Sequence, residues 1–134
     1  MSVAFADTSF YLALLSPQDN WHTAALKLSA SFRGRVLTSE YVLFELGALM
    51  CRAPLRQLFL ELIRDLESAP HVEIISASRQ CFKEGLKMFA SRSDKDWSLT
   101  DCVSFVLMQR HNIMGAFTSD HHFEQAGFQV LLKQ

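Results

Sequence analysis

Short runs of consecutive apolar residues alternate along the chain with longer segments in which apolar residues recur every three or four positions. The short runs fit strands that are buried on both faces, and the longer segments are typical of helices with one apolar face. The runs predict strands at Val3–Ala6, Val36–Leu37, Val72–Ile75, Gly115–Thr118 and Phe128–Leu132. Helices are predicted between them at 8–15, 21–32, 39–52, 55–67, 78–90 and 98–111.

This alternation indicates an α/β fold, because strands joined through helices pair in parallel and are covered on both faces. We predict a three-layer α/β/α sandwich with a central, mostly parallel sheet of about five strands. The sequence contains no internal repeat, linker or low-complexity segment. Residues 1–134 are therefore expected to form one domain.

The composition fits a compact domain and excludes several other classes. Of 134 residues, 49% are hydrophobic and 20% are charged, which excludes intrinsic disorder. Thirteen Lys and Arg against 14 Asp and Glu give a net charge of −1, so a nucleic acid would need a local basic patch. Neither a signal peptide nor a membrane span is expected. Cys51, Cys81 and Cys102 form no CxxC pair, which favours a reducing cytoplasm.

Four acidic residues are predicted to gather at one edge of the sheet. Asp7 directly follows the first strand, and Asp120 lies two residues past the fourth. Asp101 lies in the first turn of the helix at 98–111, and Glu45 lies within the helix after the second strand. In such sheets ligands bind beyond the carboxyl ends of the strands, where these side chains would meet.

Each acid also has a purely structural explanation. Asp7 can cap the helix that follows it, Asp120 can cap a short turn, and Asp101 can complete a capping box at the start of its helix. Glu45 is too far inside its helix to cap it, and its neighbours on that face are mostly apolar, so its carboxylate needs a partner. Arg52, seven residues later, offers an ion pair, and a bound cation is the alternative.

A cation accounts for the four acids together better than capping does. Carboxylates that converge without one repel each other and raise each other's pKa values. Oxygen ligands suit Mg²⁺ or Mn²⁺, which keep coordinated waters for a substrate phosphate. Such ions activate water and stabilise the leaving oxygen in phosphodiester hydrolysis, so the predicted reaction needs no nucleophilic side chain.

Four short motifs carry a resemblance that covers nearly the whole chain. They are Ala6-Asp-Thr-Ser9, Glu45 within a helix, Asp96-Trp-Ser-Leu-Thr-Asp-Cys102 and Thr118-Ser-Asp-His-His-Phe123. In this order and spacing they resemble the PIN-domain family, in the compact form of VapC-type toxin nucleases. The resemblance implies a Mg²⁺- or Mn²⁺-dependent endoribonuclease. Its catalytic and metal-binding residues would be Asp7, Glu45, Asp101 and Asp120.

By the same resemblance, hydroxyls of Thr8 and of Thr118 or Ser119 would support the site. Asp96 stands at a less constant position of the family, and we interpret it as an exposed loop acid, with an outer place in the site as the alternative. His121 and His122 could contact phosphate or carry a proton, but we interpret them as exposed turn residues.

Basic side chains recur along one predicted helix and the loop after it. They are Arg79, Lys83, Lys87, Arg92 and Lys95. Such a stripe is either a solvated helix face or the local RNA-binding path that a protein of this net charge requires. Trp97, beside the third motif, could stack on a base or pack in the core.

The resemblance further implies an RNA substrate, a cognate antitoxin and a homodimer, and no membrane partner is expected. The alternative from another class is a non-catalytic PIN-fold module that binds RNA or protein, in which the acids are only caps and ion pairs. Transfer through a phosphorylated Asp7 is disfavoured, because that chemistry usually has a second Asp two residues later and this chain has Ser9.

Overall fold

The computed structural model describes residues 2–133, which contain one five-stranded sheet with the strand order β3-β2-β1-β4-β5. The strands are β1 (Val3–Ala6), β2 (Arg35–Ser39), β3 (Val72–Ile75), β4 (Gly115–Phe117) and β5 (Gln129–Val130). Every neighbouring pair is parallel. The predicted α/β sandwich is confirmed, and its sheet is parallel across all of the described strands.

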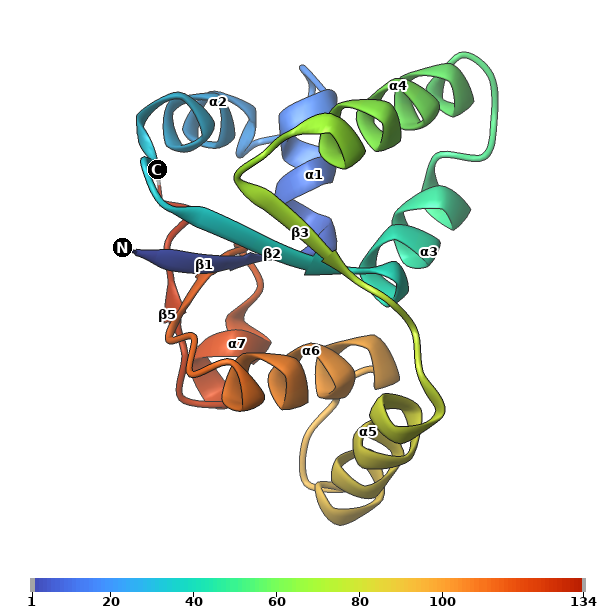
Figure 1. The fold of residues 1–134 in the computed structure, drawn as a ribbon, viewed down its shortest axis with the longest axis vertical. Helices are drawn as coiled ribbons and strands as arrows, with labels where there is room; N and C mark the ends of the chain where they lie inside the picture. Colours follow the sequence, from blue (N-terminus) through green and yellow to red (C-terminus); the bar gives the residue numbers. More distant parts are fainter. Residues whose placement is uncertain (1, 134) are drawn as a thin grey trace.

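Within these residues seven helices connect or follow the strands. They are α1 (Thr8–Leu15), α2 (His22–Ser31), α3 (Glu40–Leu49), α4 (Leu55–Ser68), α5 (Arg79–Ser91), α6 (Leu99–Arg110) and α7 (His121–Gln125). Figure 1 shows α1, α2 and α4 above the sheet and α5, α6 and α7 below it. α3 lies beyond the carboxyl end of β2 and contacts both α1 and α6, so it bridges the two helical layers at that edge.

The central strand is buried on both faces, as its continuous apolar run predicts. Ala4, Phe5 and Ala6 are fully buried, because β1 pairs with β2 on one side and β4 on the other while helices cover both faces. The next residue, Asp7, therefore enters the site from the rigid centre of the sheet.

An aromatic cluster below the sheet holds α6 and α7 in place. Phe105 of α6 packs edge-to-face against Trp97 and against Phe123 of α7, with ring centroids 5.0 and 4.9 Å apart. Phe105 and Phe123 are fully buried. Because edge-to-face aromatic contacts fix orientation as well as burying apolar area, the amino ends of both helices are held at the same edge of the sheet.

The structure corrects two predicted boundaries near that edge. Ser39 ends β2 and caps α3 by accepting the Val42 N–H at 3.2 Å, so the helix predicted from residue 39 begins at Glu40. The segment after Asp120, expected to form only a turn, is helix α7, and the Asp120 side chain caps it. Nowhere between residues 2 and 133 is a helix both long and apolar enough to cross a lipid bilayer.

Candidate active site

Two of the predicted acids meet through one hydroxyl group at the carboxyl ends of β1 and β4. Thr118 Oγ1 donates a hydrogen bond to Asp7 Oδ2 at 3.0 Å and accepts the Asp120 backbone N–H at 3.0 Å. Thr118 is fully buried and Asp7 is 5% exposed. Thr118 therefore fixes the first and the last acid of the sequence relative to each other.

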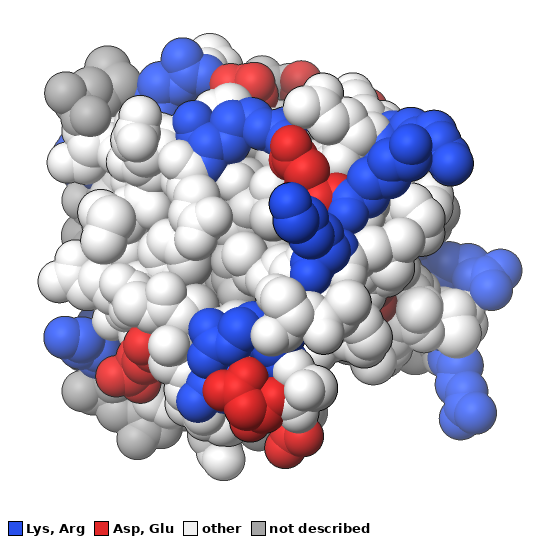
Figure 2. Space-filling model, turned by 90° about the horizontal axis from the view of Figure 1, so that it is seen from below, with Lys and Arg blue, Asp and Glu red and all other residues white. Residues whose placement is uncertain are grey.

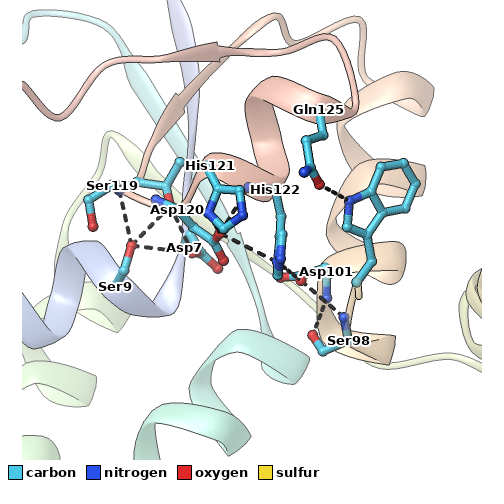
Figure 3. A network of polar contacts seen from close by, with 11 residues as sticks. Asp7, Ser9, Ser98, Asp101, Ser119, Asp120, His121, His122 and Gln125 are labelled. Atoms are coloured by element: carbon cyan, nitrogen blue, oxygen red, sulfur yellow. Dashed lines mark hydrogen bonds and ion pairs between the residues drawn. The ribbon is translucent and has the colours of Figure 1, made fainter. Parts of the chain in front are cut away.

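Ser9, in the first turn of α1, adds a second hydroxyl to this contact. Its Oγ lies 2.9 Å from Thr118 Oγ1 and 3.4 Å from Asp7 Oδ2, and it accepts the Ser119 N–H at 3.2 Å. Figure 3 shows Ser9 between Asp7 and Ser119. Ser9 was not among the predicted site residues, although its place about half a helical turn after Asp7 is a signal that the sequence offers.

Asp101 enters the site from the amino end of α6 while also capping that helix. Ser98 Oγ accepts the Asp101 N–H, and Asp101 Oδ2 accepts the Ser98 N–H, both at 3.0 Å, which is the predicted capping box. The same Oδ2 lies 3.0 Å from Nδ1 of His122. Capping and participation in the acidic site are therefore compatible for this residue.

His122 joins Asp101 to Asp120, so its interpretation as an exposed turn residue is wrong, whereas that of His121 is confirmed. Its Nδ1 is also 3.4 Å from Asp120 Oδ1, and its side chain is only 20% exposed, whereas that of His121 is 72% exposed. The burial of Phe123 fixes the rotation of α7, which turns His122 toward Asp101 (Figure 3). Ligand atoms of Asp120, His121 and His122 lie within 4.8 Å of one another, so imidazole nitrogens stand beside the carboxylates.

Glu45, on α3, is partly buried and close enough for its charge to act on Asp7. Arg52 is exposed, and in the part of the chain that the structure describes no ion pair joins it to Glu45. The ion-pair explanation of Glu45 is therefore wrong.

Burial raises the pKa of Asp7 from 3.8 to about 7, because the charged carboxylate loses its hydration. Hydrogen bonds from the Thr8 backbone and the Thr118 hydroxyl lower this pKa, whereas the charges of Asp101 and Glu45 raise it further. Burial also raises the pKa of Asp101, against the opposing effects of the Ser98 backbone and His122.

The electrostatics of this cluster fit a hard divalent cation. No Lys or Arg among residues 2–133 forms an ion pair with Asp7, Asp101 or Asp120. Carboxylates that converge with no lysine or arginine to pair them are the oxygen donors that Mg²⁺ and Mn²⁺ take, and such an ion would favour their charged forms.

The other predicted supporting residues lie apart from the acids or act through the backbone. The Thr8 hydroxyl is buried and has no hydrogen-bond partner among the described residues. Ser119 contributes its backbone N–H. Asp96 is exposed, in agreement with its interpretation as a loop acid.

The basic residues form separate groups in place of a continuous stripe. Arg79, Lys83 and Lys87 are exposed on α5. Arg92 pairs with Asp94 at 3.0 Å, and Lys95 lies 3.9 Å from the same carboxylate. Figure 2, which shows the face formed by α5, α6 and α7, has basic side chains interrupted by acidic and uncharged surface.

The fold and the site together define the class of this protein. It is an α/β/α sandwich with acidic side chains at the carboxyl edge of its parallel sheet, where the strand order reverses between β1 and β4. The chain belongs to the PIN domain family, whose model matches residues 4–129.

The similarity to several named proteins covers nearly the whole chain. The chain is 30% identical over 125 residues to the 23S rRNA-specific endonuclease VapC20 of Mycobacterium tuberculosis, covering 92% of this chain and 94% of the relative. The crystal structure of M. tuberculosis VapC20, described as a sarcin-ricin loop cleaving toxin, matches with a TM-score of 0.85 and 27% identity, covering 95% of this chain and 96% of that one. FitAcB from Neisseria gonorrhoeae covers 96% of this chain and 95% of its own, with a TM-score of 0.66 and 18% identity. It shows the shared fold alone.

Proposed function

We propose that this protein is a divalent-metal-dependent endoribonuclease that hydrolyses RNA phosphodiester bonds at the site of Asp7, Glu45, Asp101 and Asp120. The observation that carries the proposal is the buried carboxylate of Asp7, which the Thr118 hydroxyl joins to Asp120. Burial and the nearby charges of Asp101 and Glu45 raise the pKa of this carboxylate to about 7. A dication offsets this unfavourable ionisation, and family membership and the named activity of VapC20 support the reaction class.

The four carboxylates would hold Mg²⁺ or Mn²⁺. When bound, such an ion activates water for attack and neutralises charge on the phosphate. The chain itself supplies orientation. Thr118 fixes the Asp7 carboxylate, and His122 holds Asp101 and Asp120 toward each other. Their hydrogen bonds reduce the rearrangement that the acids would need in order to bind the ion.

An antitoxin partner is also proposed, because α3 and α4 carry an exposed apolar surface beyond what one domain needs. Phe44 is 80% exposed, and Leu49 and Leu60 are also exposed. A hollow of about 380 Å³ between α3 and α4 is lined mostly by apolar residues, including Phe44, Phe59 and Leu60. Exposed patches of this kind mark protein interfaces. A homodimer and a cytoplasmic location complete the proposal, and the three free cysteines are compatible with that compartment.

Cleavage of a mixed RNA pool by the purified protein tests the proposal directly. We expect cuts with Mn²⁺ or Mg²⁺ and none with EDTA. Asp7→Asn and Asp101→Asn should each lower the cleavage rate by at least about 100-fold, because each removes a charged ligand. Asp65→Asn, an equivalent change at an exposed position of α4, should leave the rate unchanged.

Melting curves separate this proposal from the non-catalytic alternative. A bound ion stabilises the folded state, so Mn²⁺ should raise the melting temperature of the wild type more than that of Asp7→Asn. Cleavage that survives EDTA, or full activity in both active-site variants, would contradict the assignment. A wild type that neither cuts RNA nor responds to Mn²⁺ would favour a binding module.

A further inference from the structure

A hollow of about 400 Å³ is walled by α5, α6, α7 and the loop before α6. Its volume lies within the range of roughly 300–1,000 Å³ that is usual for small-ligand sites. The lining includes Lys87, Arg92, Trp97, Phe105, Gln109 and Gln125. None of these residues belongs to the proposed metal site.

The hollow and the acidic site are built on the same two elements. Trp97 directly precedes Ser98, the capping residue of the helix that carries Asp101. Its Nε1 donates to Gln125 Oε1 at 2.9 Å. Gln125 lies three residues after His122 on α7, which places the two side chains one helical turn apart (Figure 3). The hollow therefore shares α6, α7 and the loop between α5 and α6 with the acidic site.

The lining combines flat, polar and charged groups, and its one acidic member, Glu84, is paired with Arg110. The Arg92 guanidinium lies 4.8 Å from the centroid of the Trp97 ring, which Phe105 holds from another side at 79°. The exposed amide of Gln109 offers donors and an acceptor, and Gln125 keeps its two N–H donors after Oε1 has accepted from Trp97. Lys87 is exposed at the rim and forms no ion pair with any described residue.

We propose that this hollow binds one nucleobase of the RNA substrate, from a nucleotide adjacent to the phosphodiester that is cut. An arginine plane supplies stacking, glutamine amides supply hydrogen bonds to a base edge, and a cation at the rim meets the backbone; single-stranded RNA is recognised by these groups. The inference rests on the proposed function and deepens it, because a seated base would fix which bond reaches the acids.

Filling the hollow tests this inference with a closely matched control. Ser91 lines the hollow at the last position of α5, where it is exposed and its Oγ donates to the Met88 carbonyl. Ser68 is exposed at the last position of α4 and likewise donates to the carbonyl three residues earlier, that of Asp65. The variants Ser91→Trp and Ser68→Trp therefore make the same change in the same local setting, on opposite sides of the sheet.

The mixed RNA pool with Mn²⁺ is the probe, and the cut ends are mapped by sequencing. We expect the wild type and Ser68→Trp to prefer one base at a fixed distance from the cut. Ser91→Trp should lose that preference and about tenfold in cleavage rate, which lies within the range for loss of one stacked base. Its Mn²⁺-induced rise in melting temperature should remain, because the acids are untouched.

A second variant changes the polarity of the hollow without filling it. Gln109→Met keeps the size of the side chain and removes the amide, so we expect a weakened base preference with smaller loss of rate. If wild type, Ser91→Trp and Gln109→Met cut at the same positions and rates, the inference is overturned while the proposed function stands. If neither the wild type nor any variant cuts RNA, the proposed function itself has failed. If Ser91→Trp loses self-association but cleaves RNA as the wild type does, the hollow is a contact between copies of the protein, and the inference is likewise overturned.

Discussion

Asp7 is the residue at which burial and neighbouring charge act most strongly in the same direction. Its carboxylate directly follows the fully buried residues Ala4 to Ala6 of β1 and lies within the fields of Asp101 and Glu45. Hydrogen bonds from Thr118 and the Thr8 backbone oppose the rise in pKa without cancelling it. Between pH 3.8 and about 7 the metal-free folded protein therefore holds a proton at Asp7 that the unfolded chain has released.

This difference predicts a pH dependence of stability in EDTA. The folded-state pKa of about 7 lies above the unfolded value of 3.8, so the contribution of Asp7 is fully present below pH 3.8 and is lost as the pH rises toward 7. Across this window Asp7 should lower the free energy of unfolding by on the order of 3 kcal/mol, and Asp7→Asn should remove that part of the slope. Urea unfolding at pH 4, 5.5 and 7 measures it. Identical slopes for the two proteins would contradict the assignment.

The acids themselves could be predicted because each stands at a fixed offset from a predicted strand or helix start. The contacts of His122 and Ser9 were harder to predict, because they depend on the direction in which each side chain points. His122 reaches Asp101 only since Phe123 fixes the rotation of α7. Ser9 reaches Thr118 only since β1 and β4 are neighbours, 109 residues apart in sequence.

Of the described helices, α5 and α6 contact each other most extensively, and Gly85 permits their close approach. Gly85 of α5 is buried against Val103 of α6, and a methyl group there would overlap Val103 Cγ2. Val103 is 1% exposed and its branched side chain has little rotational freedom, so it cannot move aside easily. This close approach sets the position of α5, which forms one wall of the hollow described above.

Replacement of this glycine should therefore be destabilising despite the better helix propensity of alanine. Alanine gains about 1 kcal/mol in a helix, but overpacking a core costs about 1–3 kcal/mol, so Gly85→Ala should lower the free energy of unfolding. In a Val103→Ala background the same change should become neutral or stabilising. Denaturant unfolding of the four proteins gives the comparison.

Gly47→Ala on α3 is the matched control, since the added methyl group would meet only the tip of the Phe59 ring, at 3.1 Å. We expect it to be neutral or mildly stabilising. A stabilised Gly85→Ala in the wild-type background would show that the contact between α5 and α6 is looser than described.

The strands and longer helices were predictable at this scale because their periodicity extends over enough residues. The helix α7 was not, because five residues, His-His-Phe-Glu-Gln, are too few to show a helical period. The strand order was not predictable from periodicity either, since it depends on which strands meet after the helices have packed.

Over the whole molecule the charges nearly cancel, so RNA must be attracted by particular groups. Arg92 and Lys95 share the carboxylate of Asp94, and Arg110 pairs with Glu84. Arg79, Lys83 and Lys87 form no ion pair within residues 2–133, and they lie on one helix. The α5 residues are therefore the best candidates for phosphate contacts.

Reversal of these three charges to Glu should weaken RNA binding and reduce its dependence on salt. Three lost contacts to single-stranded RNA would lower the slope of log affinity against log salt concentration by about 2. Fluorescence anisotropy in the Asp7→Asn background measures binding without cleavage. Reversal of Lys27, Arg56 and Arg64, which lie on α2 and α4, is the control and should change the slope less. An equal effect of the two sets would assign the attraction to net charge alone.

The contact between Asp7 and Thr118 spans 111 residues and joins two neighbouring central strands. A chain emerges from the ribosome amino end first. Asp7 therefore leaves the ribosome long before Thr118, whose hydroxyl is its partner, and Asp120 have been synthesised. A nascent polypeptide therefore cannot assemble the proposed nuclease centre. The order of translation therefore delays assembly of this centre until Thr118 and Asp120 have been synthesised.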